Sequence, residues 1–120
     1  MKTYKEIYSY LINEYFNMCK DDDYTPKTSL KKKVVMYYLA NLKAIAKSSK
    51  NESCHLLNFK ILLKNDLELN DCEKIVKVSK ETSLGCYFLS DKAIISILDE
   101  CIKKIFIYAF GNWQNFKKML

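Results

Sequence analysis

The sequence predicts an all-α protein that forms one domain over residues 1–120. Only two glycines and one proline occur in the chain, which leaves few of the tight turns that β-hairpins need. Nearly half of the residues, 49%, are hydrophobic, enough to bury a core without disulfides or metals. Apolar side chains also recur every three or four residues along most of the chain, which is the spacing of amphipathic helices.

Two amphipathic helices are predicted in the N-terminal half. The first covers residues 3–19, and a connector with three aspartates and the single proline separates it from the second. The hydroxyl of Thr28 or Ser29 is expected to cap the second helix, which ends in the polar stretch 48–51. Their apolar stripes contain Tyr4, Ile7, Tyr8, Leu11, Tyr15 and Met18 in the first helix, and Leu30, Val34, Tyr38, Leu42 and Ile45 in the second.

Two further helices are predicted before residue 90. The third covers residues 53–64, and its second half is apolar almost all round, so we expect it to lie between other helices. After a break at residues 65–69, Asn70 and Glu73 have the spacing of a capping box, which predicts a fourth helix over residues 71–89.

The C-terminal part predicts a long helix, a corner and a short helix. Ser90 is expected to cap the long helix, which ends at Gly111. Glycine adopts a left-handed backbone without strain, so Gly111 suits a residue that closes one helix and lets the next begin at an angle. Trp113 and Phe116 lie on the short helix, and burial of the indole of Trp113 is expected to anchor it on the core.

The charge pattern argues against nucleic-acid binding. All twenty basic residues are lysine, and the formal net charge is +6. Arginine makes the planar, bidentate contacts typical of base and phosphate recognition, whereas lysine acts as a point charge. Because the lysines are scattered, we expect a solvated basic surface and no nucleic-acid partner, with a lysine-rich nucleic-acid binder as the weaker alternative.

The residues needed for catalysis and for metal binding are scarce. His55 is the only histidine, and the five cysteines are spaced without a C-x-x-C pair, which argues against a zinc site. There is no glycine-rich phosphate loop and no nucleophile motif. We therefore expect no enzyme activity, no cofactor, and reduced, mostly buried thiols. No apolar run approaches the ~20 residues of a membrane span, so we expect no transmembrane anchor.

Two stretches resemble homology regions of the B-cell lymphoma 2 (Bcl-2) family. Residues 109–116, AFGNWQNF, are similar to the second homology region, in which glycine and tryptophan are followed after two residues by phenylalanine. Residues 66–78, DLELNDCEKIVKV, are similar to the first, in which an Asn-Trp-Gly-Arg run precedes Ile-Val. Alignment on this Ile-Val pair places Asp71 at the family's asparagine and Lys74 at its arginine.

The resemblance implies a helical bundle around a central buried helix, here residues 71–89. Beside that helix, the family holds the amphipathic pro-death helix of host pro-apoptotic proteins in a surface groove. The family's arginine pairs with an aspartate of that helix, and Lys74 keeps the charge without the bidentate geometry. The expected groove residues are Tyr38, Leu42, Phe59, Leu63, Asp71, Lys74, Ile75 and Val78.

Brevity and the frequent use of Lys, Asn, Ile and Tyr resemble the minimal Bcl-2-like proteins of large DNA viruses. The resemblance implies a viral apoptosis inhibitor in the host cell cytoplasm, or peripherally at mitochondria. The alternative is a dimeric Bcl-2-fold interaction module that suppresses innate immune signalling without a functional groove, because Cys72 and Glu73 replace the family's tryptophan and glycine. Tyr4, Tyr8 and Tyr15 are expected to belong to the core, with a homodimer face as the alternative.

Overall fold

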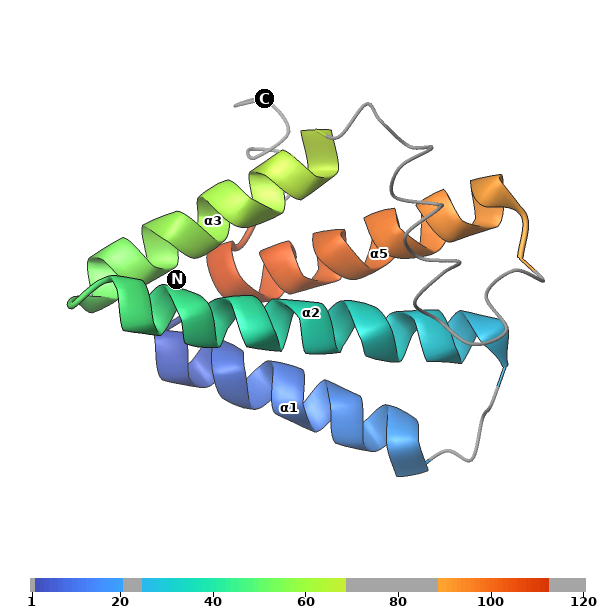
Figure 1. Ribbon diagram of the computed structural model, residues 1–120, viewed down its shortest axis with the longest axis horizontal. Helices are drawn as coiled ribbons and strands as arrows, with labels where there is room; N and C mark the ends of the chain where they lie inside the picture. The colour runs from blue at the N-terminus through green and yellow to red at the C-terminus, as the bar shows by residue number, and fades with distance from the viewer. Residues whose placement is uncertain (1, 21–24, 69–88, 113–120) are drawn as a thin grey trace.

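The computed structural model describes residues 2–20, 25–68 and 89–112, which form four α-helices and no strand. The helices are α1 (Tyr4–Lys20), α2 (Pro26–Ser48), α3 (Glu52–Glu68) and α5 (Asp91–Phe110). α2 packs against each of the other three, and α3 also packs against α5. Figure 1 shows α2 crossing the bundle between α1 and α3. The predicted all-α class is confirmed, and the expected central helix at 71–89 lies outside the described residues apart from its last one.

Side-chain caps determine where α2 and α5 begin. Ser90 Oγ accepts a hydrogen bond from the amide of Ala93 at 3.2 Å, so the predicted cap of α5 is confirmed. The predicted cap of α2 is wrong, because Thr25 Oγ1 accepts the bond and Thr28 supplies the amide, at 3.3 Å. Pro26 follows the cap, where its missing amide costs nothing and its fixed φ favours the first helical turn.

α3 differs from the sequence expectation in length and in position. It continues to Glu68, so residues 65–68 of the expected break are helical. Leu57 and Ile61 are 57% and 45% exposed, which means that α3 is not enclosed by other helices. Its apolar residues are divided between a packed face and a face that is open to solvent.

The core lies where α2 meets the other three helices. The predicted stripe of α2 is buried from Leu30 to Leu42, and Ile45 packs against it partly buried. Three tyrosines of α1 also pack partly buried against the core: Tyr4, Tyr8 and Tyr15. This agrees with the expectation from the sequence that they belong to the core. The buried residues are Ile7, Leu11, Leu30, Val34, Val35, Tyr38, Leu42, Leu56, Phe59, Leu63, Ile94, Ile97, Ile102, Ile105, Phe106 and Ala109.

The C-terminus of α5 is closed by Gly111. Its amide donates to the carbonyl of Ile107 at 3.0 Å, and its φ of 96° confirms the predicted positive value. With ψ at −125°, however, the residue lies outside the left-handed helical region, so the corner uses a conformation that is open mainly to glycine. Trp113 and Phe116 lie outside the described residues. Among the described helices, none has the length and apolar character that crossing a membrane requires.

Candidate partner-helix site

Four of the eight predicted groove residues lie in the described helices, and all four are core residues. Tyr38 and Leu42 lie on α2 and Phe59 and Leu63 on α3, and none is more than 1% exposed. They were expected to form the walls of an open groove. In the structure their surfaces are already covered by neighbouring residues. The other four, Asp71, Lys74, Ile75 and Val78, lie outside the described residues.

Aromatic contacts join the helices at this seam. The rings of Tyr38 and Phe59 stack with centroids 6.1 Å apart and planes inclined by 23°. Phe59 also meets Phe110 of α5 edge-on at 6.3 Å, and Phe110 lies 5.3 Å from Phe106. The sequence therefore identified residues from two different helices that do converge. In the structure these residues pack against one another in the core.

A partly buried hydrogen bond joins α2 and α3 at this seam. The hydroxyl of Tyr38 donates to Oδ2 of Asp66 at 2.7 Å. Burial raises the pKa of the Asp66 carboxyl, and the hydrogen bond from Tyr38 opposes that rise. Burial is also the largest cause of the raised pKa of Tyr38, followed by the nearby charge of Asp66. The phenol is thus held neutral as a donor, which suits a structural link between the helices.

The histidine and the described cysteines do not form a reactive site. His55 Nε2 lies 2.7 Å from the carbonyl oxygen of Ser49, at the turn between α2 and α3. Cys19 and Cys54 are exposed and Cys101 is partly buried, all as free thiols, so the expectation of mostly buried thiols is wrong for the first two. Burial raises the pKa of the Cys101 thiol to about 11. Across the described residues, no group of three His, Cys, Asp or Glu side chains could hold a metal ion.

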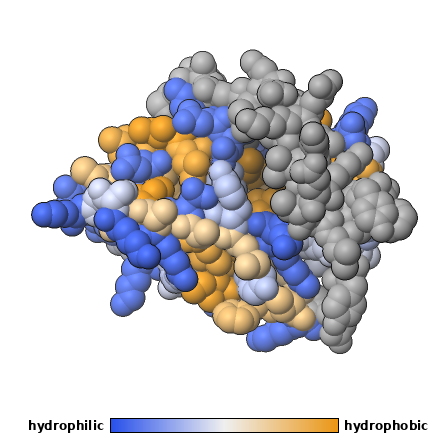
Figure 2. Space-filling view, in the orientation of Figure 1, coloured by the Kyte–Doolittle hydropathy of each residue, from blue (hydrophilic) through white to orange (hydrophobic). Residues whose placement is uncertain are grey.

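The outward side of α2 carries exposed residues that were not among the predicted site residues. Met36 and Tyr37 are each 49% exposed, and exposed lysines precede and follow them on the helix. Figure 2 shows apolar surface interspersed with hydrophilic residues on the face that α2 crosses. The signal was present in the helical spacing of these residues, because a helix whose core stripe is known also has a defined outer stripe.

The chain matches no protein-family model, and comparisons with curated proteins and with solved structures give no match. The resemblance to the Bcl-2 family therefore rests on the two quoted stretches.

Proposed function

We propose that this chain is a Bcl-2-like interaction module of viral type, which suppresses host innate immune signalling through its outer surface without catalysis. The observation that carries this choice over an open groove is the burial of Tyr38, Leu42, Phe59 and Leu63, each at most 1% exposed. A partner helix needs apolar side chains that it can reach. In the described part of the α2–α3 seam, the side chains predicted for that purpose are already packed.

Inhibition of apoptosis by capture of a pro-death helix is the second candidate. It is favoured by the convergence of the predicted groove residues, since Tyr38 of α2 stacks on Phe59 of α3. Capture would require these helices to separate and the bond from Tyr38 to Asp66 to break. An entering amphipathic helix would bury its own apolar stripe against the same side chains, which offsets part of that cost.

Calorimetric titration with a panel of pro-death peptides separates the two functions. If the chain is an interaction module, the folded protein should bind none of the peptides at concentrations of tens of micromolar. A dissociation constant in that range corresponds to a binding free energy of about −6 to −7 kcal/mol. Binding in that range would favour apoptosis inhibition instead. In that case Lys74→Glu should weaken binding, because Lys74 aligns with the family's arginine, whereas Lys5→Glu on α1 is the matched control and should not.

Host-protein capture and sedimentation velocity test the module directly. The proposal predicts a dimer and recovery of a signalling adaptor in place of pro-apoptotic proteins. Recovery of pro-apoptotic proteins alone, by a monomeric sample, would overturn it. Circular dichroism of the same sample shows that the protein used is folded.

A further inference from the structure

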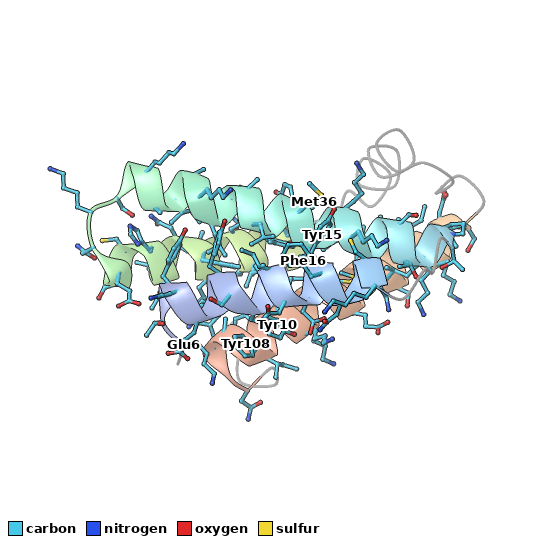
Figure 3. The ribbon with its side chains drawn as sticks, turned by 90° about the horizontal axis from the view of Figure 1, so that it is seen from below. Glu6, Tyr10, Tyr15, Phe16, Met36 and Tyr108 are labelled. Carbon is cyan, nitrogen blue, oxygen red and sulfur yellow. The ribbon has the colours of Figure 1, made fainter. Side chains whose placement is uncertain are left out.

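The outer side of α2 carries a regular pattern of exposed side chains, of which Lys43 also lies over the ring of Tyr8 on α1, with Nζ 6.0 Å from the ring centroid. Seven exposed residues, here called the α2 outer face, are Lys33, Met36, Tyr37, Ala40, Lys43, Ala44 and Lys47. At about 100° per residue they fall within an arc of roughly 120°, on the side of the helix away from its buried stripe. Figure 3 shows Met36 projecting from α2 away from the bundle, in agreement with its exposed fraction of 49%.

The formal excess of positive over negative charge in the protein is located on this helix. α2 contains six lysines and no Asp or Glu, whereas the other fourteen lysines of the chain are balanced by its fourteen carboxylates. Three of the six belong to the α2 outer face: Lys33, Lys43 and Lys47. Within the described part of the chain, none of these three forms an ion pair with a carboxylate. The face therefore favours an anionic partner.

We propose that the α2 outer face is a docking surface for an acidic amphipathic helix of a partner protein. Lys33 lies at one end of the face and Lys47 at the other, about 21 Å apart at 1.5 Å per residue. Between them Met36 and Tyr37 supply apolar contact area. A helix that fits this face has carboxylates toward both ends and an apolar stripe in the middle.

The two alanines of the face favour a helix as the occupant. Ala40 and Ala44 are one turn apart and have no side chain beyond Cβ, so a second helix can approach along the ridge between them. Interaxial distances of about 8 Å, the low end of the usual range, are reached where small residues face each other. An extended peptide has no comparable need for that close approach.

Two other anionic surfaces fit less well. Helices that lie on membranes carry large apolar residues such as Trp, Phe and Leu along one side, whereas the middle of this face has one methionine, one tyrosine and two alanines. Nucleic-acid surfaces favour continuous basic contacts, often from arginine, and the face interrupts its lysines with apolar side chains. Both surfaces are outcomes of the test below.

The proposed surface is separate from the seam with α3. Tyr38 and Leu42 lie on the buried side of α2, whereas Met36 and Lys43 lie on its exposed side. Docking on the α2 outer face therefore requires no separation of helices. The proposal stands or fails independently of whether pro-death peptides bind.

The test uses a fluorescently labelled synthetic helix of about 18 residues, with glutamates toward both ends and a leucine stripe between them. Its affinity is measured by anisotropy at low ionic strength, with a scrambled peptide of the same composition as the control. Two variants remove equal charge from exposed positions. One loses the lysines of the face and the other loses lysines elsewhere: K33Q/K43Q/K47Q and K5Q/K50Q/K92Q.

The expected result is a loss of affinity confined to the first variant. We expect K33Q/K43Q/K47Q to weaken binding at least about tenfold and the control triple variant at most about twofold, because only the first changes charges in contact with the peptide. Met36→Ser should weaken binding about threefold or more, through lost apolar burial. In 15N-labelled protein, the peptide should shift the amide signals of residues 33–47.

Several results would overturn the proposal. These are no binding by folded wild-type protein, equal losses in the two triple variants, equal binding of the scrambled peptide, or amide shifts that lie away from α2. Anionic vesicles or duplex DNA that bind more tightly than the peptide and depend on the same three lysines would assign the face to a different partner class. Circular dichroism of each variant separates loss of binding from loss of fold.

Discussion

The hydroxyl of Tyr38 on α2 donates a hydrogen bond of 2.7 Å to Oδ2 of Asp66 on α3. These residues are separated by 28 positions in the chain, and Tyr38 is only 1% exposed. The bond satisfies a polar group that would otherwise be buried without a partner, which costs about 1–3 kcal/mol. It also fixes the last part of α3 against α2, where the sequence pattern had suggested a break.

Replacement of Tyr38 by phenylalanine should destabilise the protein by about 1–2 kcal/mol. The ring and its stacking on Phe59 remain. The loss of stability therefore measures the effect of removing the hydroxyl and of leaving the Asp66 carboxylate without this donor. Urea unfolding followed by circular dichroism measures the change. Tyr8→Phe is the matched control, since the described contacts of Tyr8 are made by its ring. Equal stability of wild type and Tyr38→Phe would contradict a structural role for the bond.

The Asp66 carboxyl should make stability fall as pH rises. Burial raises its pKa above the ordinary value of 3.8, so the folded protein binds this proton more tightly than the unfolded chain does. That contribution is complete below the unfolded pKa and is lost as pH increases through the folded pKa. Relative to Asp66→Asn, whose amide oxygen can accept the same bond, wild type should therefore lose stability as the pH rises above about 4, the ordinary pKa of the carboxyl.

The Tyr38→Phe variant provides a second measurement of the same effect. The hydrogen bond from Tyr38 lowers the pKa of Asp66, so its removal should extend the fall in stability to higher pH. Urea unfolding across a pH series, for each protein with and without Asp66→Asn, gives both comparisons. A difference between wild type and Asp66→Asn that is independent of pH would show that this carboxyl is not perturbed by folding.

The sequence predicted best what depends on local spacing. The stripe of α2 was found because Leu30, Val34, Tyr38 and Leu42 recur every four residues, and Ser90 was recognised as a cap because a serine there precedes the apolar pattern of α5. The cap of α2 was misplaced because threonines stand at both 25 and 28. Either can act as a cap, and the position of Pro26 decides between them.

Properties that depend on neighbours far along the chain could not be predicted in the same way. α3 has apolar residues around much of its circumference, so periodicity alone could not show that Phe59 and Leu63 face the core while Leu57 and Ile61 face solvent. For a related reason the sequence did not show that Tyr38 and Phe59, expected to line a groove, are buried in the core. An apolar stripe has the same spacing whether it faces a partner or another helix of its own chain.

Replacement of Gly111 should destabilise the end of α5 through the backbone alone. A Cβ added at this position meets nothing within 4 Å, so Gly111→Ala is expected to cost about 1–3 kcal/mol from its positive φ. Gly111→Asn tests which backbone conformation the residue adopts. Asparagine tolerates the left-handed helical region better than alanine does, but at a ψ of −125° it should be nearly as destabilising as alanine. Urea unfolding of both variants measures the cost. Stability equal to wild type in Gly111→Asn would indicate a left-handed helical corner instead.

Two contacts between α1 and α5 should respond differently to salt. Tyr10 and Tyr108 stack with ring centroids 3.9 Å apart and planes inclined by 9°, and Figure 3 shows them facing each other. A double-mutant cycle of Tyr10→Ala and Tyr108→Ala should give a coupling of about 0.5–1.5 kcal/mol. Because this coupling comes from packed rings, it should be nearly the same at low and at high salt.

The matched comparison is the ion pair on the same two helices. Lys104 Nζ lies 3.2 Å from Oε2 of Glu14, and the lysine side chain is 64% exposed. A cycle of Glu14→Gln and Lys104→Gln should give less than about 1 kcal/mol, and this coupling should decline in ~1 M salt, where the Debye length is about 3 Å. If the tyrosine coupling also declined with salt, or if it were the smaller of the two, aromatic packing would not be what holds α1 against α5.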